Sequence, residues 1–541
     1  SLRRQRQMCI RDRTNPFPSA LGQAAGRHYS YARMKTPLSW LAAVVAALAL
    51  VPAKPLAKAE KQPNIIFFLS DDHRWDRLGS AGHPFLKTPT LDRLAKEGVR
   101  FTNAYAACHV CSPTRASIMT GKYPGRLDLT DWLSGRRDFD FQRFLSAEKR
   151  QALPLSEFTL AEALKASGYR TGVFGKWHLG NNEFGPLNQG FDVQIPSWNG
   201  CCPKGGYHPP YRMEGLKIEG KEDEYLTDRL NSMALQFMEQ SGDRPFFLYL
   251  SHFSVHDPIQ GRKDLVEKYR AKLNRLPSAK GPAFILEGNP DDETPLSRKQ
   301  LTGFLSKPSH RGHKVLPQRT IKIKQRQDNI EFAAMVESVD ESLGRLLQKL
   351  EELGHEDNTI VIFYSDNGGM SAGNFGNPAR IVSQSQLDRA YATSNLPLRG
   401  GKGWLYEGGI RVPMIVKWPG KGRAGMICRE PVISPDFYPS ILEMAGLPPR
   451  STQHKDGRSF APALLGDEFK RGPIYWHFPH YSNHGMQSPA GAIRDGDYKL
   501  LEYFENGTVQ LFNLKTDLGE QHDLSVAQPE RARDLLAKLH A

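Results

Sequence analysis

The sequence predicts an α/β protein: a doubly wound, mostly parallel sheet flanked by helices, followed by a smaller C-terminal α+β subdomain that holds an antiparallel sheet. Residues 63–70, 246–250 and 359–365 are continuous apolar runs, which are typical of strands buried on both faces of a parallel sheet. Residues 331–353 repeat apolar side chains at steps of three and four, which predicts a long helix. Near the C-terminus, residues 493–504 and 508–514 flank a Glu-Asn-Gly turn, which favours a hairpin.

Shorter patterns complete the alternation of helices and strands. Thr90 is the expected N-cap of a helix that Gly98 ends, and residues 158–167 predict a helix that leads into a strand at 170–174. Because strands and helices alternate along the chain, we expect helices on both faces of the sheet. We also expect a terminal helix at 528–540, and we interpret the polar, basic stretch 261–327 as an insertion over the rim of the functional site.

The N-terminal segment is expected to lie outside the mature fold. Residues 1–33 are rich in arginine and are interpreted as an upstream leader, and residues 34–59 have the basic start, apolar run and Ala-Lys-Ala end of a signal peptide. The apolar run of about 14 residues is shorter than the roughly 20 that a membrane helix needs, although an N-terminal anchor is the alternative. We therefore expect a periplasmic or secreted protein with no stable membrane span, a main domain at 60–430 and a C-terminal subdomain at 431–541.

The charge of the chain favours an anionic substrate over nucleic acid. The formal net charge is +14, of which residues 1–33 carry +6 and residues 34–59 carry +3, so that about +5 remains for the rest. An excess of this size suits an anionic small molecule. We expect no nucleic-acid partner, because the main basic run, 314–326, has no interleaved aromatic residues.

The six cysteines match no zinc spacing. Cys9 falls in the expected leader. Cys201 and Cys202 are adjacent, and because neighbours in sequence seldom meet disulfide geometry, we do not expect them to pair with each other.

Polar side chains follow the ends of several predicted strands: Asp71 and Asp72 after 63–70, Lys176 and His178 after 170–174, and Asp366 and Asn367 after 359–365. Ligands of doubly wound sheets bind beyond the carboxyl ends of the strands, so we expect these side chains to converge. Three carboxylates and one amide oxygen suit a hard cation, calcium or magnesium. Either acidic pair alone would more often be a helix cap or a turn.

Residues 111–121 carry the most specific motif. The core Cys111-Ser112-Pro113-Thr114-Arg115, followed by Thr120-Gly121, resembles the signature of the type I, formylglycine-dependent sulfatases, an arylsulfatase-like family of the alkaline-phosphatase-like superfamily. The resemblance implies that a formylglycine-generating maturation enzyme oxidises Cys111. It also implies a bound Ca²⁺, less often Mg²⁺, held by Asp71, Asp72, Cys111, Asp366 and Asn367. A buried structural thiol is the alternative for a lone cysteine.

The chemistry of formylglycine accounts for the residue types of this motif. One hydroxyl of its hydrate can attack sulfur while the metal lowers the hydroxyl pKa, and the other can then expel the sulfate and regenerate the aldehyde. Pro113 favours the start of a helix, which places residue 111 at a helix N-terminus, where anions are stabilised. Arg115 lies four residues on and so on the same helical face, where it can neutralise the nucleophile or the ester oxygens.

Three further motifs resemble parts of the family. Lys176 and His178, in Gly-Lys-Trp-His-Leu-Gly, match the residues that hold the formylglycine and its sulfate ester. Lys402, in Gly-Gly-Lys-Gly, matches the lysine that binds the sulfate and faces the leaving oxygen. His256 matches the histidine proposed as general acid to the leaving alcohol, and His252 is the alternative.

Aromatic and histidine-rich loops are candidates for contact with sugar rings. Residues 476–484, with His480, have this composition, and Tyr207, His208 and Tyr211 are similar. Ordinary loop packing is the alternative for all of them. Lys122 fits either a contact at the rim of the site or a solvated surface lysine.

The resemblance implies a sulfuric ester hydrolase that removes sulfate from a sulfated carbohydrate, as in the degradation of sulfated polysaccharides, with aryl sulfates as incidental substrates. One rival is a phosphomonoesterase or phosphodiesterase of the same superfamily, which would use Ser or Thr and two zinc ions held by several histidines. The other is an inactive carbohydrate-binding relative. Retention of Cys111, Arg115, Lys176, His178 and Lys402 argues against the second rival, because mere binding has no need of all five.

Overall fold

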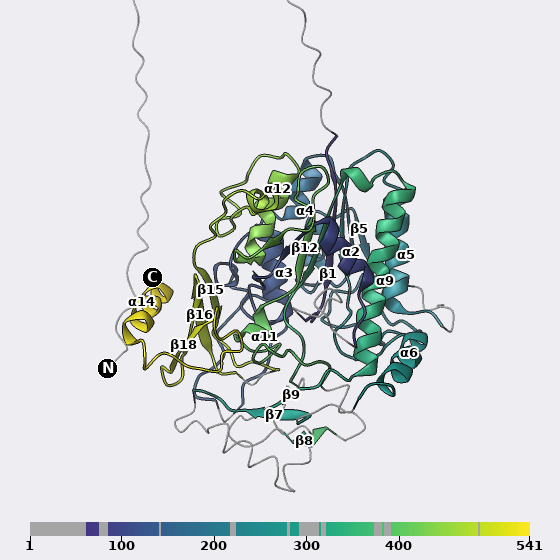
Figure 1. Cartoon of the computed structure of the whole chain (residues 1–541). Coiled ribbons are helices and arrows are strands. Elements are labelled where there is room, and N and C mark those ends of the chain that lie inside the picture. The colour runs from purple at the N-terminus through teal and green to yellow at the C-terminus, as the bar shows by residue number, and fades with distance from the viewer. Residues whose placement is uncertain are drawn as a thin grey trace, which may run out of the picture. The chain divides into compact units, whose positions relative to one another are not determined.

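The central sheet follows the strand order β13-β2-β12-β10-β1-β6-β4-β5. Figure 1 labels β12, β1 and β5 of this sheet. Its strands are β1 (Asn64–Ser70), β2 (Val99–Phe101), β4 (Arg170–Gly175), β5 (Val193–Ile195), β6 (Phe246–Ser251), β10 (Thr359–Ser365), β12 (Met414–Lys417) and β13 (Ile427–Cys428). β1 pairs in parallel with both β10 and β6, and β4 continues the parallel order to β5. β12 runs antiparallel to its neighbours β10 and β2. The predicted mostly parallel sheet is confirmed.

The computed structural model describes residues 61–74, 85–139, 142–216, 223–277, 282–291, 313–314, 321–372, 381–382, 391–484 and 487–541. Residues 61–541 cluster as one compact unit. The expected leader and signal peptide, residues 1–33 and 34–59, lie outside the described residues. Among the helices that are described, none combines the length and the apolar character needed to cross a bilayer.

Alternate side chains of β1 pack in two separate cores, which explains why this strand is apolar throughout. Ile65, Phe67 and Leu69 pack in one core, and Ile66 and Phe68 pack in the other; all five are fully buried. A strand with water on one side would instead alternate apolar and polar residues. Both faces of the sheet are therefore covered, as a doubly wound fold requires.

Helices cover the two faces. The core with Ile66 and Phe68 takes side chains from α2 (Pro89–Glu97), α5 (Leu226–Glu239) and α9 (Ile330–Glu352), and α6 (Lys263–Leu273) packs on α9. The other core takes side chains from α3 (Cys111–Thr120), α4 (Leu160–Ala166), α12 (Phe437–Met444) and α13 (Ala461–Leu465). The prediction for α9 differs by one residue at each end. The predicted N-cap Thr90 is wrong: the cap of α2 is Thr88, because Pro89 and Thr90 already lie in the first turn, where proline is favoured.

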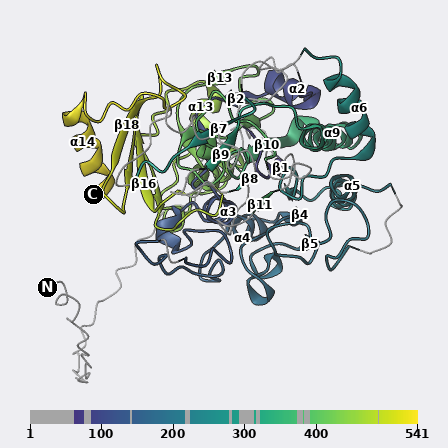
Figure 2. The same cartoon turned by 90° about the horizontal axis from the view of Figure 1, so that it is seen from below.

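The C-terminal region forms a second, four-stranded antiparallel sheet, as predicted. Its strands are β15 (Ile474–Phe478), β16 (Ala490–Asp495), β17 (Tyr498–Tyr503) and β18 (Val509–Asn513), and α14 (Pro529–His540) lies on one side of it (Figure 2). The predicted single strand at 493–504 is instead parts of β16 and β17, because Gly496, at φ 59°, turns the chain between them. β15 was expected as part of a loop. Residues 432–465 pack in the core of the central sheet, and the small sheet begins at Ile474.

The remaining elements are short. They are β3 (Ala104–Tyr105) paired with β14 (Val432–Ile433), β7 (Phe284–Glu287) with β9 (Ile321–Lys324), β8 (His313–Lys314) with β11 (Ile381–Val382), α11 (Glu407–Ile410), and the 3-10 helices Pro124–Leu127, Asn182–Phe184, Pro186–Asn188, Glu356–Asn358 and Ser434–Asp436. Of the predicted insertion at 261–327, the described part contains α6, β7, β8 and β9, and the rest lies outside the described residues.

A buried ionic cluster joins α11 to the small sheet. Lys499, on β17, lies 3.0 Å from Glu407 Oε1 and 2.8 Å from Glu520 Oε1. The hydroxyl of Tyr105 donates to Glu407 Oε2 at 2.8 Å, and the backbone N–H of Glu407 donates to Glu520 Oε2 at 2.7 Å. All four side chains are fully buried, so each charge depends on its partners for solvation.

Candidate active site

Asp71, Asp72, Asp366 and Asn367 lie together because β1 and β10 are neighbouring parallel strands that end at the same edge. Ser70 pairs with Ser365 in the register of these strands, so the residues that follow them meet. The backbone N–H of Asp72 donates to Asp366 Oδ1 at 3.2 Å, and Asn367 Nδ2 donates to Asp72 Oδ1 at 2.7 Å. All four side chains are buried. The structure thus brings four of the five predicted ligands into one site.

The amide of Asn367 is turned in a way that fits a cation. Its Nδ2 group donates to Asp72 and to the Gly368 carbonyl oxygen, at 2.7 and 3.0 Å. Its Oδ1 atom is buried and has no hydrogen-bond partner. A buried acceptor without a donor is costly, and a hard cation bound by oxygen atoms would satisfy it. The described residues therefore fit a calcium or magnesium ion.

Cys111 is the first residue of α3, next to this carboxylate site. Its Sγ atom lies 3.9 Å from Asp71 Oδ1, and the side chain is buried. Val110, the N-cap residue, is extended and offers no side-chain cap, so the N–H groups of the first turn are not capped by it. The oxygen atoms of a sulfate ester at residue 111 would meet the positive end of this helix.

Arg115 contacts the ligand carboxylates. Its Nε and Nη2 atoms lie 2.9 and 2.7 Å from Asp366 Oδ2, and Nη2 lies 3.2 Å from Asp71 Oδ2. Nη1 donates to Ser251 Oγ at 2.6 Å and to the Lys176 carbonyl oxygen at 2.9 Å. The sequence predicted a residue that neutralises the nucleophile or the ester; the geometry gives Arg115 the position of a group that orients Asp71 and Asp366.

Two lysines offset the remaining negative charge. Lys176 Nζ lies 2.5 Å from Asp71 Oδ2, and Lys402 Nζ lies 2.7 Å from Asp72 Oδ1. Burial lowers the pKa of each lysine, but the nearby negative groups, first Asp71 for Lys176 and Asp72 for Lys402, together raise it above its usual value, so that both stay charged. With Arg115, three cations surround three carboxylates. Such a site can hold both a divalent cation and an anion.

Glycines bring Lys402 close to the metal-site loop. A Cβ on Gly368 would lie 1.9 Å from the Gly408 carbonyl oxygen, so only glycine permits this approach of two backbones. The N–H of Lys402 donates to the Gly369 carbonyl oxygen at 3.0 Å, and the N–H of Gly403 donates to the His109 carbonyl oxygen at 3.1 Å. Lys402 is thus tied by its backbone to the loop after β10 and to the segment before Cys111.

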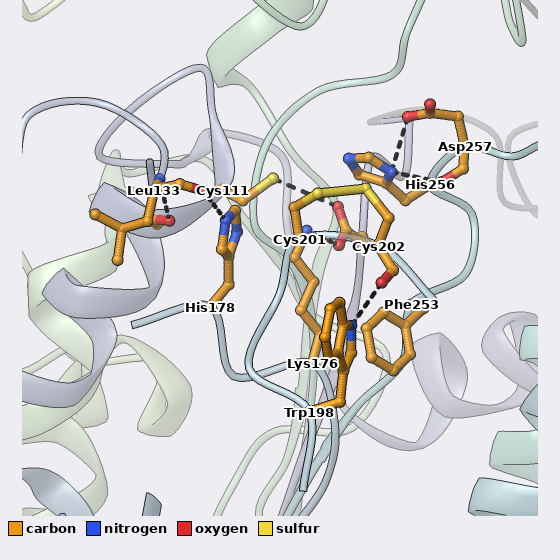
Figure 3. The surroundings of a disulfide bond; sticks show 12 residues. Cys111, Leu133, Lys176, His178, Trp198, Cys201, Cys202, Phe253, His256 and Asp257 are labelled. Carbon is orange, nitrogen blue, oxygen red and sulfur yellow. Dashed lines mark hydrogen bonds and ion pairs between the residues drawn. A yellow bond between two sulfur atoms is a disulfide. The ribbon is translucent and has the colours of Figure 1, made fainter. Parts of the chain in front are cut away.

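His178 lies in the surroundings of Cys111 and Lys176 (Figure 3). Its Nε2 atom contacts the Leu133 carbonyl oxygen at 2.6 Å, and its Nδ1 atom is buried without a partner. Burial and the charge of Lys176 hold the pKa of His178 well below its usual range, so the ring is neutral. His178 and Asp72 both adopt left-handed backbone conformations, at φ 58° and 57°, which is typical of residues held for function.

His256 is held as a charged ring. Its Nδ1 atom lies 2.9 Å from Asp257 Oδ1, and its Nε2 atom lies 3.9 Å from Asp72 Oδ2. Burial and Lys402 lower the pKa of His256, and Asp72 and Asp257 are the largest causes that raise it; the net result is a pKa well above the usual value. The sequence singled out His256 but not Asp257, whose signal was its position directly after the histidine.

His252 does not fit the role of general acid. Its ring packs on Phe68 and contacts Ser342 Oγ at 2.9 Å, so it lies in the core between the sheet and α9. Burial lowers its pKa to about 3, so the ring carries no proton to give at neutral pH. The alternative assignment to His252 is therefore set aside.

Two buried histidines near Lys402 were not predicted as site residues. Both ring nitrogens of His109 and both of His484 are buried without a hydrogen-bond partner. Burial holds the pKa of His484 well below its usual value, and the charge of Lys402 lowers it further. The side chains of His484 and Lys402 are therefore close enough for their charges to interact. Buried imidazoles without partners have hydrogen-bonding capacity left for a ligand. His109 could have been noticed from its place two residues before Cys111.

The other sequence candidates turn out to be packing or anchoring residues. His480 is buried, with Nε2 2.8 Å from Thr130 Oγ1, a contact that favours the alternative of ordinary loop packing. Tyr207 is buried and donates to the carbonyl oxygens of Phe253 and His256, at 2.7 and 2.9 Å. His208 contacts the Gly261 carbonyl oxygen, and Tyr211 is buried. Lys122 pairs with Glu157 at 2.6 Å and is largely buried, so it is not a solvated surface lysine.

Cys201 and Cys202 form a disulfide, so the expectation that they would not pair is wrong. The expectation assumed that neighbouring side chains diverge, but the chain bends at both residues, which turns the two sulfur atoms to the same side. Cys108, Cys111 and Cys428 are free thiols. Figure 3 shows that the surroundings of the disulfide include Cys111, Lys176, His178 and His256.

The sequence and the structure of this chain are similar to those of known sulfatases. A family model described as "Sulfatase" matches residues 63–447, and one described as "N-sulphoglucosamine sulphohydrolase, C-terminal" matches residues 401–541. A "Sulfatase" of Formosa agariphila is 28% identical over 89% of this chain and 88% of its own length. Human N-acetylgalactosamine-6-sulfatase is 31% identical over 77% of this chain and 69% of its own length. The structure of Ps i-CgsB in complex with k-i-k-neocarrahexaose matches with 27% identity and a TM-score of 0.64, over 88% of this chain and 92% of that one.

Proposed function

This chain belongs to the sulfatase family and is a sulfatase hydrolase, and we propose that it removes sulfate from a sulfated carbohydrate, with a formylglycine at position 111 and a bound calcium ion. The observation that carries the proposal is the arrangement around Cys111. A helix N-terminus, three carboxylates, an unpartnered amide oxygen and two buried lysines meet at one point. Each of these groups has a use in the transfer of a sulfuryl group.

The two groups that the residues would hold supply the central chemistry. Calcium at Asp71, Asp72, Asp366 and Asn367 would lower the pKa of a hydroxyl at residue 111 and neutralise sulfate oxygens, and formylglycine would supply that hydroxyl as a hydrate. Magnesium is the less favoured ion. The remaining functions belong to side chains of this chain, and they follow from the positions described above.

The side chains bind the sulfate, hold the nucleophile and supply a proton. Lys402 and Lys176 are charged and buried, so they can neutralise ester oxygens in a medium where a charge counts for more than in water. His178, neutral and held at Nε2 by Leu133, can bond residue 111 through Nδ1. His256 carries a proton on Nε2, which faces the site, and can give it to the leaving alcohol.

Two observations favour a sugar as the leaving group: the names of the relatives, and the unpartnered nitrogen atoms of His109 and His484. Human N-acetylgalactosamine-6-sulfatase bears the name of a sulfated sugar, and Ps i-CgsB was solved with a carrageenan-type hexasaccharide. His109 and His484 offer four unpartnered buried nitrogen atoms, which suits the hydroxyl groups of a carbohydrate. An aryl sulfate would use the sulfate-binding groups alone and would be an incidental substrate.

The experiment that tests the function combines mass spectrometry of the Cys111 peptide with measurements of turnover. The protein is produced with and without a formylglycine-generating enzyme, the aldehyde content of the Cys111 peptide is measured by mass spectrometry, and turnover is measured on sulfated mono- and disaccharides. We expect activity in proportion to the aldehyde content. Full activity in Cys111→Ala would contradict the nucleophile, and activity only on phosphate esters would favour the phosphatase rival.

We propose, further, that the protein works in the periplasm or outside the cell. The expected signal peptide at 34–59 motivates this. The Cys201–Cys202 disulfide supports it, because stable disulfides are rare in reducing compartments. Fractionation of cells that express the native chain, with sequencing of the mature N-terminus, tests it. A mature protein found in the cytoplasm with residues 34–59 intact would contradict it.

A further inference from the structure

We propose that the Cys201–Cys202 disulfide forms an apolar wall of the leaving-group site and packs against the sugar ring from which sulfate is removed. The inference rests on the proposed function, because it concerns the same site. Figure 3 shows the disulfide among Cys111, Lys176 and His178 and the pair His256 and Asp257. No motif of the sequence pointed to this position.

The position follows from the proton donor. The Cys202 sulfur, a ring nitrogen of His256 and a carboxylate oxygen of Asp257 all lie within 4.8 Å of one another. A leaving oxygen that takes a proton from His256 must come within about 3 Å of the ring nitrogen. A sugar whose leaving oxygen is held there lies in the surroundings that His256 shares with the disulfide, so the disulfide is in a position to contact its ring.

The chemistry of the disulfide suits the apolar face of a sugar. A disulfide has no N–H or O–H group, and its sulfur atoms are large and polarisable, so they attract C–H groups by dispersion. Cys201 and Cys202 are both half-buried, which leaves part of the pair open to a ligand. Beside charged and polar groups such as Lys176 and His256, this wall supplies apolar area of the kind that ligand sites usually contain.

Trp198 supports the wall from behind. Its Nε1 atom donates to the Cys202 carbonyl oxygen at 2.8 Å. A Cβ on Gly200 would lie 2.5 Å from Trp198 Cζ2, so glycine at this position lets the indole ring lie against the chain next to Cys201. The bend that carries the disulfide therefore has a fixed backing.

The loop of the disulfide and the segment of His256 are joined independently of the sulfur atoms. The Tyr207 hydroxyl donates to the carbonyl oxygens of Phe253 and His256, and its backbone N–H donates to Gln260 Oε1 at 3.0 Å. The N–H of Ser197 donates to the Glu214 carbonyl oxygen at 2.7 Å. Loss of the disulfide should therefore remove the wall without moving His256.

The test is the double substitution Cys201→Ala with Cys202→Ala in aldehyde-loaded enzyme. We expect KM for a sulfated sugar to rise about tenfold from the loss of apolar contact, while kcat stays within about twofold. The inhibition constant of inorganic sulfate, which occupies only the charged part of the site, should not change. Cys428→Ala, at a buried thiol on the edge strand β13, is the matched control and should leave all three constants unchanged.

Two measurements keep the test independent of the variant's folding and turnover. Reduction of the wild type by a phosphine, followed by intact mass, should reproduce the rise in KM and should have no effect on the double variant. In a Cys111→Ser background, which binds without turnover, calorimetry should show about tenfold weaker binding of the same sulfated sugar.

Three results would overturn the proposal. One is an unchanged KM in the folded double variant and in the reduced wild type. Another is an equal fall of kcat on the sugar sulfate and on methyl sulfate, which would mean that the disulfide only shapes the catalytic groups. The third is a wild type that hydrolyses aryl sulfates but no sulfated sugar; this result appears before any variant is made and refutes the proposed substrate class together with the wall.

Discussion

Two oxygen atoms of Asp257, the backbone carbonyl oxygen and Oδ1, each lie 2.9 Å from Nδ1 of His256, and together they set the direction of the other ring nitrogen. Nε2 then points to the side of Asp72, 3.9 Å away, where the leaving oxygen of a substrate would lie. The two carboxylates raise the pKa of His256, so that the ring holds its proton at neutral pH. A general acid needs both properties, direction and charge.

We expect His256→Ala to lower kcat for a sugar sulfate by roughly 10²–10⁴-fold, the range for loss of general acid catalysis. An aryl sulfate leaves as a stabilised phenolate and needs less protonation, so its kcat should fall far less. Steady-state kinetics on both substrates measure the difference. An equal loss on both would remove His256 as the acid.

Asp257→Asn should shift the pH profile of kcat on the sugar sulfate. The active ring is protonated, so activity is present below the pKa of His256 and is lost as pH rises through it. Removing the charge of Asp257 lowers that pKa, and the alkaline limb should therefore move to lower pH. An unmoved alkaline limb would assign it to another group.

The metal site can be tested without activity. A ligand that binds only the folded protein raises its melting temperature, so calcium should stabilise chelator-treated wild type, and Asp72→Ala should abolish this shift. Asn367→Ala, which removes the unpartnered amide oxygen, should weaken calcium binding measured by calorimetry. The substitution Asp456→Ala, at a carboxylate paired with Arg126 away from the site, is the control. Recovery of turnover with zinc but not calcium would speak for the phosphatase rival.

His484 and His480 form a pair of variants that separates recognition from packing. His484 has two buried nitrogens without partners near Lys402, so His484→Ala should raise KM for the sugar sulfate by about tenfold and leave aryl sulfate turnover nearly unchanged. His480 is buried against Thr130, so His480→Ala should lower the melting temperature and leave KM unchanged. The reverse pattern would return the sugar contact to His480.

Buried neutral histidines should make the fold sensitive to acid. The pKa of His252 falls from 6.5 to about 3 through burial. Its folded-state pKa is thus the lower one: the unfolded chain takes up a proton first, and stability is lost as pH falls from 6.5 towards 3. The expected loss is on the order of a few kcal/mol.

His252→Gln should flatten this dependence. The drop in melting temperature between pH 7.5 and pH 4.5 should be smaller in this variant than in the wild type. His522→Gln, at an exposed ring, is the control and should behave as the wild type does. An equal drop in His252→Gln would show that other groups govern the acid response.

Sequence patterns predicted the elements whose cause is local. β10 was predicted to the residue, because its apolar run begins at Thr359 and stops where Asp366 begins. β15 was missed: its five residues alternate between buried and exposed, but the tryptophan and histidine among them were interpreted as a loop. A short strand with polar residues on its outer face differs little from a loop in composition.

The site residues were predictable where a motif names them, and their partners were not. The spacing to Cys111 identified Arg115, but only the fold shows that its guanidinium contacts Asp366 and Asp71. The pairing of Cys201 with Cys202 depends on the direction of two adjacent side chains, which no sequence pattern reports. Likewise, whether the nitrogens of His484 have partners is decided by residues far away in the chain.

The ionic cluster of Lys499, Glu407 and Glu520 makes the central sheet and the small sheet depend on each other. A chain that ended before β15 would lose the ammonium group of Lys499, 3.0 Å from Glu407 Oε1, and keep Arg411, 3.3 Å from Glu407 Oε2, as a partner of this carboxylate. The small sheet therefore could not be exchanged freely for an unrelated sheet. A replacement without a cation at the place of Lys499 would leave Glu407 and Glu520 with one buried partner fewer, so the sequence of the small sheet has to match that of α11.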